Sequence, residues 1–460
     1  MMPRMKRFAL LLAMLCLTCF AARPALAQQI LRDAETESLL QDMSRPLIEA
    51  AGLQPANVRV ILINDKSINA FVAGGQIVYL HSGLIDEAVS ANEVQGVIAH
   101  EIGHIVGGHV PLQGDGGATT ISLLSLVLGV AAMAAGAPEA GAAALMAGQR
   151  AAIGQYLAFS RGQESAADAA GVRFLNTAEV SGFGMLEFFK KLQNMEYRYG
   201  YYKSTPGNDP FVRSHPMSAD RMATLTADLK DKPGWKKGPD PALEVRFKRV
   251  QAKLRGYVNE PQDTLRIYPT TDKSVQAHYA RAYAYHKSGY PDQAAAETGA
   301  LVAAAPNDPY FLELQGQILL ESGRPAEALA PLRRATLETN YQPLIASSFG
   351  HALIATDDAA NLAEAEKVLR QAVARDRENP YAWYQLGMVY ERKGDSARAA
   401  LATAERADLI GDPRMALASS RAAMAGLPQS SSDWVRAQDI LLVSQTAVEE
   451  MRRNGRRNLQ

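Results

Sequence analysis

The sequence predicts a mainly helical protein in two parts: an α+β domain with a small sheet or hairpin, followed by an α-solenoid. Three observations support this prediction. The chain has 460 residues, too many for one ordinary hydrophobic core. β-branched residues and turn signals cluster before residue 81, which favours strands there. The second half of the chain repeats small residues and prolines at a regular spacing, which is typical of stacked helical units.

Charge and composition indicate a folded protein. The chain has 48 basic and 48 acidic residues, and 47% of its residues are hydrophobic. Apolar side chains are therefore numerous enough to form packed cores, which disordered chains lack. Because positive charge is not in excess, the composition does not support nucleic acid as a partner.

The first 27 residues have the features of a secretory signal peptide. A basic stretch at residues 4–7 precedes the apolar run FALLLAMLCLTCF, and the small residues of ALA end the segment at Ala27. We expect cleavage after Ala27 and export to the periplasm. Both cysteines, Cys16 and Cys19, lie in this segment, so the mature chain would contain no thiol, which suits an oxidising compartment. The alternative is an N-terminal membrane anchor, although the apolar run is short for a span.

Residues 28–230 are interpreted as the first domain. NVRVILIN (57–64) predicts a strand, and INAFVAGGQIVYL (68–80) predicts a hairpin that turns at Gly74-Gly75. Helical periodicity follows at 84–89, 91–108, 150–177, 183–195 and 217–230. The segment 231–242 is dense in proline, glycine and charge, so residues 231–270 are predicted to form a linker with one amphipathic helix.

The sequence repeats between residues 271 and 430. Small residues recur at spacings of 34, 34 and 37 residues, at Ala282, Gly316, Gly350 and Gly387, and the three extra residues fall near TDDAAN (356–361). This period resembles tetratricopeptide (TPR) repeats, whose paired helices stack into a curved array that commonly binds peptide or protein. A helix at about 432–453, within residues 431–460, is expected to cap the array.

The run ANEVQGVIAHEIGHIVGGHV (91–110) carries the main functional signal. His100 and His104 are four residues apart, so both imidazoles lie on one face of a helix, where they can bind one zinc ion. Glu101 stands close enough to take a proton from water at the metal rather than bind the metal itself. The alternative is two chance histidines, but burying them with Glu101 in an apolar helix would be costly without a metal.

The third metal ligand must come from farther along the chain. Val110 occupies the place of a metzincin's third histidine. His109 comes one residue before that place and, on a continuing helix, would point about 140° away from His104. We therefore expect it to contact a metal ligand without binding the metal, or to lie at the surface. Glu164 and Asp168 share one face of a predicted helix: Glu164 could complete a His-His-Glu set, and Asp168 could orient a ligating histidine. Such a carboxylate pair alone would more commonly mark a solvated helix face.

Four motifs together resemble the CAAX-prenyl-protease-type gluzincin metallopeptidases: HEIGH (100–104), SRGQESAAD (160–168), INAFVAGGQIVYLHSGLI (68–85) and RSHPMSADR (213–221). The resemblance implies a zincin-type domain in which His100, His104 and Glu164 bind one Zn²⁺ per chain and Glu101 is the catalytic base.

Further roles follow from the same resemblance. Asn69, Ala70 and Phe71 would lie beside the strand that binds the substrate. His215 would lie near the metal, as a possible fourth ligand with a regulatory or transition-state role, and Arg221 would be its partner in the motif.

Together with the signal peptide and the repeats, the resemblance implies a periplasmic zinc metalloendopeptidase. Its clients would be outer-membrane β-barrel proteins that are unfolded or stalled in assembly, and it would also assist their assembly. The TPR array would dock these clients or the β-barrel assembly complex. The alternative is a TPR-based assembly chaperone or adaptor with a latent, largely structural zinc site.

Residues 116–138 carry no charge and are long enough to cross a bilayer. A single crossing would separate His100 and His104 from Glu164, which must share their metal. We therefore favour a lid or close helical hairpin over the cleft rather than insertion into a membrane. Peripheral contact with a membrane or with exposed β-barrel chains is a further alternative.

Overall fold

The computed structural model describes residues 30–109, 161–199, 215, 218–230 and 232–457. The predicted signal peptide and the uncharged stretch 116–138 lie outside these residues. Within the described ranges, no helix is both long and apolar enough to cross a membrane.

The first part of the chain contains a four-stranded sheet. Its strands lie in the order β1-β2-β4-β3, with bounds β1 (Ile30–Leu31), β2 (Arg59–Ile63), β3 (Ala70–Ala73) and β4 (Ile77–His81). β3 and β4 form the predicted antiparallel hairpin, and Gly74 and Gly75 turn it with φ of +62° and +95°, a region that favours glycine. β4 lies between β2, with which it pairs in parallel, and β3. β3 is therefore at one edge of this sheet.

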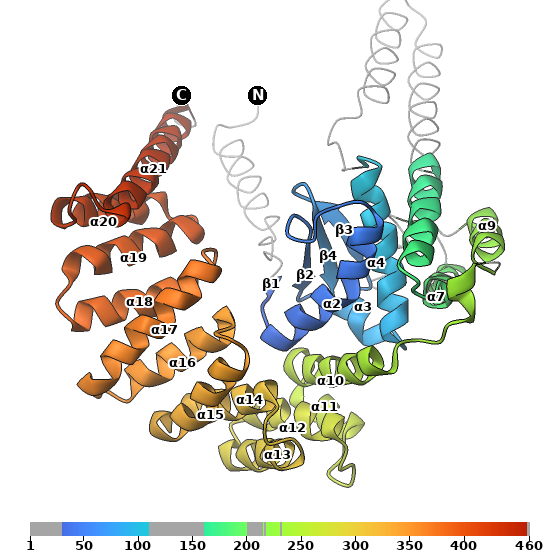
Figure 1. Cartoon of the computed structure of the whole chain (residues 1–460), viewed down its shortest axis with the longest axis horizontal. Coiled ribbons are helices and arrows are strands. Elements are labelled where there is room, and N and C mark those ends of the chain that lie inside the picture. The colour runs from blue at the N-terminus through green and yellow to red at the C-terminus, as the bar shows by residue number, and fades with distance from the viewer. Residues whose placement is uncertain (1–29, 110–160, 200–214, 216–217, 231, 458–460) are drawn as a thin grey trace, which may run out of the picture.

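Three helices pack against this sheet (Figure 1): α2 (Ala34–Ala50), α3 (Ser82–Glu87) and α4 (Ala91–Val106). A helix over 161–177 and α7 (Phe183–Tyr199) pack against α4, and α9 (Ala219–Lys230) packs against α7. Ser90 begins α4, because its hydroxyl accepts a hydrogen bond from the Glu93 backbone N–H. Every residue of α4 from 91 to 104 is buried, so α4 lies in the core and its polar side chains are buried there as well.

The segment predicted as a linker contains η1 (Pro233–Lys236), α10 (Pro241–Val258) and α11 (Pro261–Ile267). α10 is the predicted amphipathic helix, but it is not a free connection. Phe247 and Val250 are each only 1% exposed and belong to the same core as α2 and α4, while the other side of α10 packs against the first repeat helix. The helix thus packs against both parts of the molecule.

The predicted repeats form helix pairs that stack into an arc (Figure 1). The pairs are α12 (Val275–Lys287) with α13 (Pro291–Ala304), α14 (Pro309–Glu321) with α15 (Pro325–Glu338), α16 (Pro343–Ala355) with α17 (Leu362–Arg375), and α18 (Pro380–Arg392) with α19 (Ser396–Leu409), followed by α20 (Pro413–Gly426) and α21 (Ser432–Arg457). Gly316 and Gly350 lie where paired helices touch: a Cβ there would come within 2.4 and 2.5 Å of leucine side chains. The three extra residues form η2 (Ala359–Asn361), as the spacing predicts.

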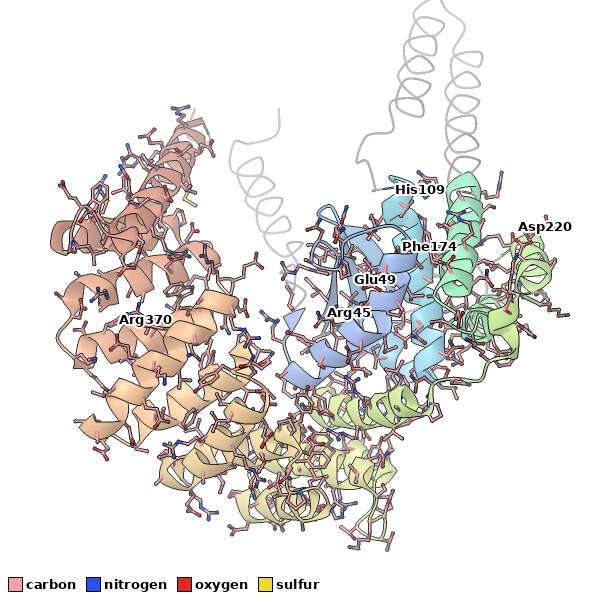
Figure 2. The ribbon with its side chains drawn as sticks, in the orientation of Figure 1. Arg45, Glu49, His109, Phe174, Asp220 and Arg370 are labelled. Atoms are coloured by element: carbon pink, nitrogen blue, oxygen red, sulfur yellow. The ribbon has the colours of Figure 1, made fainter. Side chains whose placement is uncertain are left out.

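The arc bends back toward the sheet of the first part. Arg32 pairs with Asp376 at 2.9 Å, and Arg59 of β2 pairs with Glu378 at 2.8 Å. Between them lies a cavity of about 860 Å³, lined by α2, β1, β2 and the connection from α17 to α18. Figure 2 shows Arg45 and Glu49 on α2 and Arg370 on α17 in this view of the two parts.

Candidate metal centre

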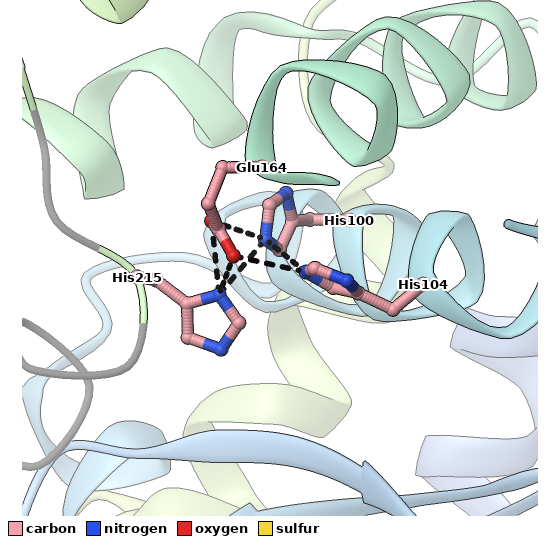
Figure 3. A group of neighbouring side chains, drawn as sticks. All are labelled: His100, His104, Glu164 and His215. Carbon is pink, nitrogen blue, oxygen red and sulfur yellow. Dashed lines mark hydrogen bonds and ion pairs between the residues drawn. The ribbon is translucent and has the colours of Figure 1, made fainter. Parts of the chain in front are cut away.

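Four side chains from three segments meet in the core of the first part. His100 and His104 come from α4, Glu164 from the helix over 161–177, and His215 from the segment before α9 (Figure 3). One nitrogen or oxygen from each side chain lies within 4.8 Å of the others. His100 Nε2 is 3.1 Å from His104 Nε2, and His215 Nδ1 is 3.0 Å from each Glu164 oxygen. All four are buried, so the structure assembles the set that the sequence singles out.

Close helix packing brings the carboxylate to the histidines. At Gly103 of α4, a Cβ would lie 2.6 Å from the backbone oxygen of Ala167, and at Gly171 it would lie 3.3 Å from the backbone of Ala99. The backbones of the two helices are therefore in close contact, and the approach at Gly103 leaves no room for a Cβ. Glu164 consequently reaches the pair of imidazoles, at 3.4 Å from both His100 Nε2 and His104 Nε2.

Asp168 and Arg221 form the layer outside these four residues. Asp168 Oδ1 lies 3.0 Å from His100 Nδ1, on the side of the ring opposite the Nε2 cluster. Arg221 donates to both Asp168 oxygens, at 2.7 and 2.8 Å, and its third nitrogen lies 3.0 Å from Glu164. The expectation that Asp168 contacts a histidine of the set agrees with this geometry, and Arg221 bridges two carboxylates.

The electrostatics of the cluster favour a bound cation. Burial alone would lower the pKa of His100, but hydrogen bonds to Asp168 and Glu164 and their charges raise that pKa to about 10. Burial would raise the pKa of Glu164, yet the charge of His215 and hydrogen bonds from the histidines hold that pKa far below its usual range. The buried carboxylates therefore demand positive charge, and imidazole nitrogens with a carboxylate oxygen are the donors that zinc prefers.

The Glu101 side chain lies beside the four donor side chains but is not one of them. Its side chain is fully buried, and neither carboxylate oxygen has a hydrogen-bond partner among the residues that the structure describes. His215 Nε2 lies 3.7 Å from Glu101 Oε1. Burying a carboxylate without hydrogen bonds costs free energy unless water or a metal-bound group completes its contacts. Glu101 therefore fits a site that holds both a metal ion and water.

His109 lies closer to the cluster than a continuing helix would place it. α4 ends at Val106, and Gly108 has a φ of +66°, so the chain reverses before His109. The rotation of about 140° holds only for a continuing helix, so it does not apply here. The His109 Nδ1 lies 3.2 Å from His104 Nδ1, and the choice between support of that ligand and a surface position stays a prediction.

The predicted substrate residues lie at the edge of the sheet. Asn69 immediately precedes β3, Ala70 and Phe71 lie in β3, and the Phe71 ring stacks on Tyr79 at 5.0 Å between ring centroids. Phe189 of α7 is a contact that the sequence does not single out. Its ring meets His100 edge to face at 5.4 Å, but helical periodicity marks it only as a core residue.

Two models of known protein families match different parts of the chain. Residues 33–228 match the model of peptidase family M48, and residues 275–343 and 355–416 match a tetratricopeptide repeat model. The chain carries an M48 peptidase domain followed by TPR repeats. The M48 domain supports a metalloprotease activity, and the buried histidine and glutamate group could bind its metal.

Several curated proteins resemble the chain. The beta-barrel assembly-enhancing protease of Escherichia coli is 24% identical over 425 residues, which cover 88% of this chain and 83% of that protein. A Vibrio cholerae relative is 28% identical over 298 residues, 62% of this chain and 59% of its own length. Metalloprotease LoiP of Escherichia coli is 32% identical over 173 residues, which cover 36% of this chain and 60% of LoiP.

Proposed function

We propose that the protein is a zinc metalloendopeptidase in which His100, His104 and Glu164 bind one Zn²⁺ and Glu101 is the general base. The observation that carries the proposal is the convergence of these donors, from helices sixty residues apart, beside the buried Glu101 carboxylate, whose oxygens have no hydrogen-bond partner among the described residues. The M48 match supports the same reaction class.

Zinc at this site would supply a Lewis acid that polarises the scissile carbonyl and favours ionisation of water. Glu101 takes the proton from the attacking water and later delivers it to the leaving amine nitrogen. Asp168 holds the His100 ring from its Nδ1 side, and Arg221 holds Asp168 and Glu164 in turn. An extended peptide is proposed to add to the edge strand β3 near Asn69, because backbone pairing accepts many sequences.

His215 is proposed to hold the enzyme latent. Its Nδ1 lies among the ligand atoms, 3.2 Å from His100 Nε2 and 3.0 Å from the Glu164 oxygens. A fourth protein ligand turns an open catalytic zinc site into a closed one, because it takes the position that water needs. Movement of the segment that carries His215 would then open the site.

The proposed setting is the periplasm, with unfolded or stalled outer-membrane β-barrel proteins as clients and the β-barrel assembly complex as docking partner. Two findings support this: TPR repeats suggest protein partners, and relatives that cover most of the chain are named for β-barrel assembly. The alternative is an assembly adaptor in which the zinc site is chiefly structural.

Glu101→Gln separates the two functions. The amide cannot act as a base, so cleavage of an unfolded β-barrel client should fall about 10²–10⁴-fold or more, while zinc content stays at one ion per chain. Unchanged cleavage would contradict the peptidase proposal. If outer-membrane assembly in cells is intact with Glu101→Gln but fails when the repeats are removed, the adaptor function is the correct one.

A further inference from the structure

The turn after α4 places His109 beside the metal centre, next to His104. Gly107 and Gly108 end the helix, and the His109 backbone N–H donates to the His104 carbonyl at 2.9 Å. At Gly107, a Cβ would lie 2.5 Å from two ring atoms of His109, so a side chain there would displace the ring. Figure 2 places His109 at the end of α4. The two glycines thus permit one specific position for this imidazole.

The His109 ring contacts the nitrogen of His104 that faces away from the cluster. The two Nδ1 atoms are 3.2 Å apart, and the ring centroids are 5.2 Å apart at an angle of 72°. His104 Nε2 points the other way, toward His100 and Glu164. A neutral imidazole has one N–H, so an Nε2 lone pair available for a metal requires the proton on Nδ1, where it needs an acceptor.

The same arrangement exists on the other histidine of α4. His100 has its Nε2 in the cluster and its Nδ1 3.0 Å from Asp168 Oδ1, so each α4 histidine has an atom that can act as an acceptor within reach of its outer nitrogen. The two acceptors differ in charge and setting. Asp168 is a carboxylate held by Arg221, whereas His109 is an imidazole at the half-buried end of the helix.

We propose that His109 is a positioning residue for the metal centre: its Nδ1 accepts the Nδ1–H of His104 and so fixes the tautomer and ring orientation that present His104 Nε2 to the metal. The inference rests on the proposed function, since it takes His104 as a ligand. Partners of this kind commonly change metal affinity about 10–100-fold when they are removed.

Two substitutions at one position test the hydrogen bond. In His109→Asn, the side-chain oxygen can take the place of Nδ1 as acceptor, whereas His109→Leu fills similar space without an acceptor. Zinc affinity is measured for the full chain by competition with a chromophoric chelator. We expect His109→Leu to bind zinc about 10–100-fold more weakly and His109→Asn to stay within about threefold of wild type. The melting temperature of the metal-free protein should be the same for all three, because the contact acts through the metal ligand.

The remaining outcomes are decisive in the other direction. Unchanged zinc affinity in His109→Leu would overturn the inference, as would an equal loss in both variants or a lower melting temperature of the metal-free His109→Leu protein that accounts for the loss. His104→Ala is the reference: if it loses zinc while His109→Leu does not, only the role of His109 fails. A wild-type chain that binds no zinc would overturn both this inference and the proposed function.

Discussion

His215 occupies the position from which a single side chain could control the site. It lies 3.0 Å from both Glu164 oxygens, and its other nitrogen lies 3.7 Å from Glu101. It therefore stands between the proposed ligands and the proposed base. At the scale of single residues, the proposed latency depends on whether this imidazole is present.

Substituting His215 by alanine should separate binding from inhibition. His100, His104 and Glu164 remain, so zinc should still be present at one ion per chain, while the vacated position admits water. We expect faster cleavage of an unfolded client than by wild type, measured as kcat/KM, with metal content from plasma emission. A fall in kcat with zinc retained would instead assign His215 a transition-state role. Loss of zinc would make it an essential ligand.

At the scale of elements, the metal centre depends on how closely two helices approach. Gly103 lies against the backbone of Ala167, one residue before Asp168, so the spacing of these helices sets the distance from Glu164 to the histidines. A methyl group at position 103 must push the helices apart, because its neighbour is backbone rather than a flexible side chain.

Gly103→Ala should therefore weaken both folding and metal binding. We expect a loss of about 1–3 kcal/mol in the free energy of unfolding of the metal-free protein, and a weaker zinc affinity because Glu164 is displaced. Gly162→Ala is the matched control: it lies in the opposing helix, and among the described residues no atom beyond the neighbouring backbone of its own helix lies within 4 Å of its would-be Cβ, so it should be neutral or stabilising. Equal effects of the two variants in chelator competition and urea unfolding would refute this packing argument.

The sequence predicts the elements that rest on local periodicity and turn chemistry. The hairpin at Gly74-Gly75, α4 with its paired histidines, the repeats and the extra turn near residues 356–361 all follow from spacing along the chain. Glu164 and Asp168 could be paired with α4 because the first two ligands were incomplete without a third.

Features that depend on tertiary contact could not be derived in this way. The helix α10 reads as part of a linker, since proline, glycine and charge surround it, yet its apolar face completes the core of the M48 domain. The reversal at Gly108 escaped prediction because a glycine can continue a helix or leave it, and only its neighbours decide. Phe189 shows no sign of touching His100, because periodicity records burial and not the identity of the neighbour.

At the scale of the whole molecule, a buried group of charges ties the repeats to the M48 domain. Lys253 of α10 forms ion pairs with Asp33 and Glu35 at the start of α2. Tyr279 of α12 donates to Glu35 at 2.6 Å. Arg249, also on α10, pairs with Glu35 at 2.5 Å. It also pairs at 2.6 Å with Asp308, the N-cap residue of α14. The relative position of the two parts is therefore set by side chains in the interior rather than by a flexible connection.

Lys253→Met should weaken this junction. Methionine matches the length of the lysine stem but leaves Asp33 and Glu35 with less compensating charge in a buried place, and breaking such a pair commonly costs about 3–5 kcal/mol. Urea unfolding of the metal-free chain measures the change. Lys190→Met on α7 removes an exposed ion pair with Glu187 and should cost about 1 kcal/mol or less. Comparable losses in both variants would show that the junction does not depend on the buried charge.

We propose that one metal ion is held jointly by α4 and by the helix over 161–177. Anomalous diffraction at the zinc absorption edge, from crystals of the purified mature chain, would locate this ion. We expect a single peak within about 2.2 Å of His100 Nε2, His104 Nε2 and a Glu164 oxygen. A chain without such a peak, or with zinc bound elsewhere and these three atoms unoccupied, would contradict it.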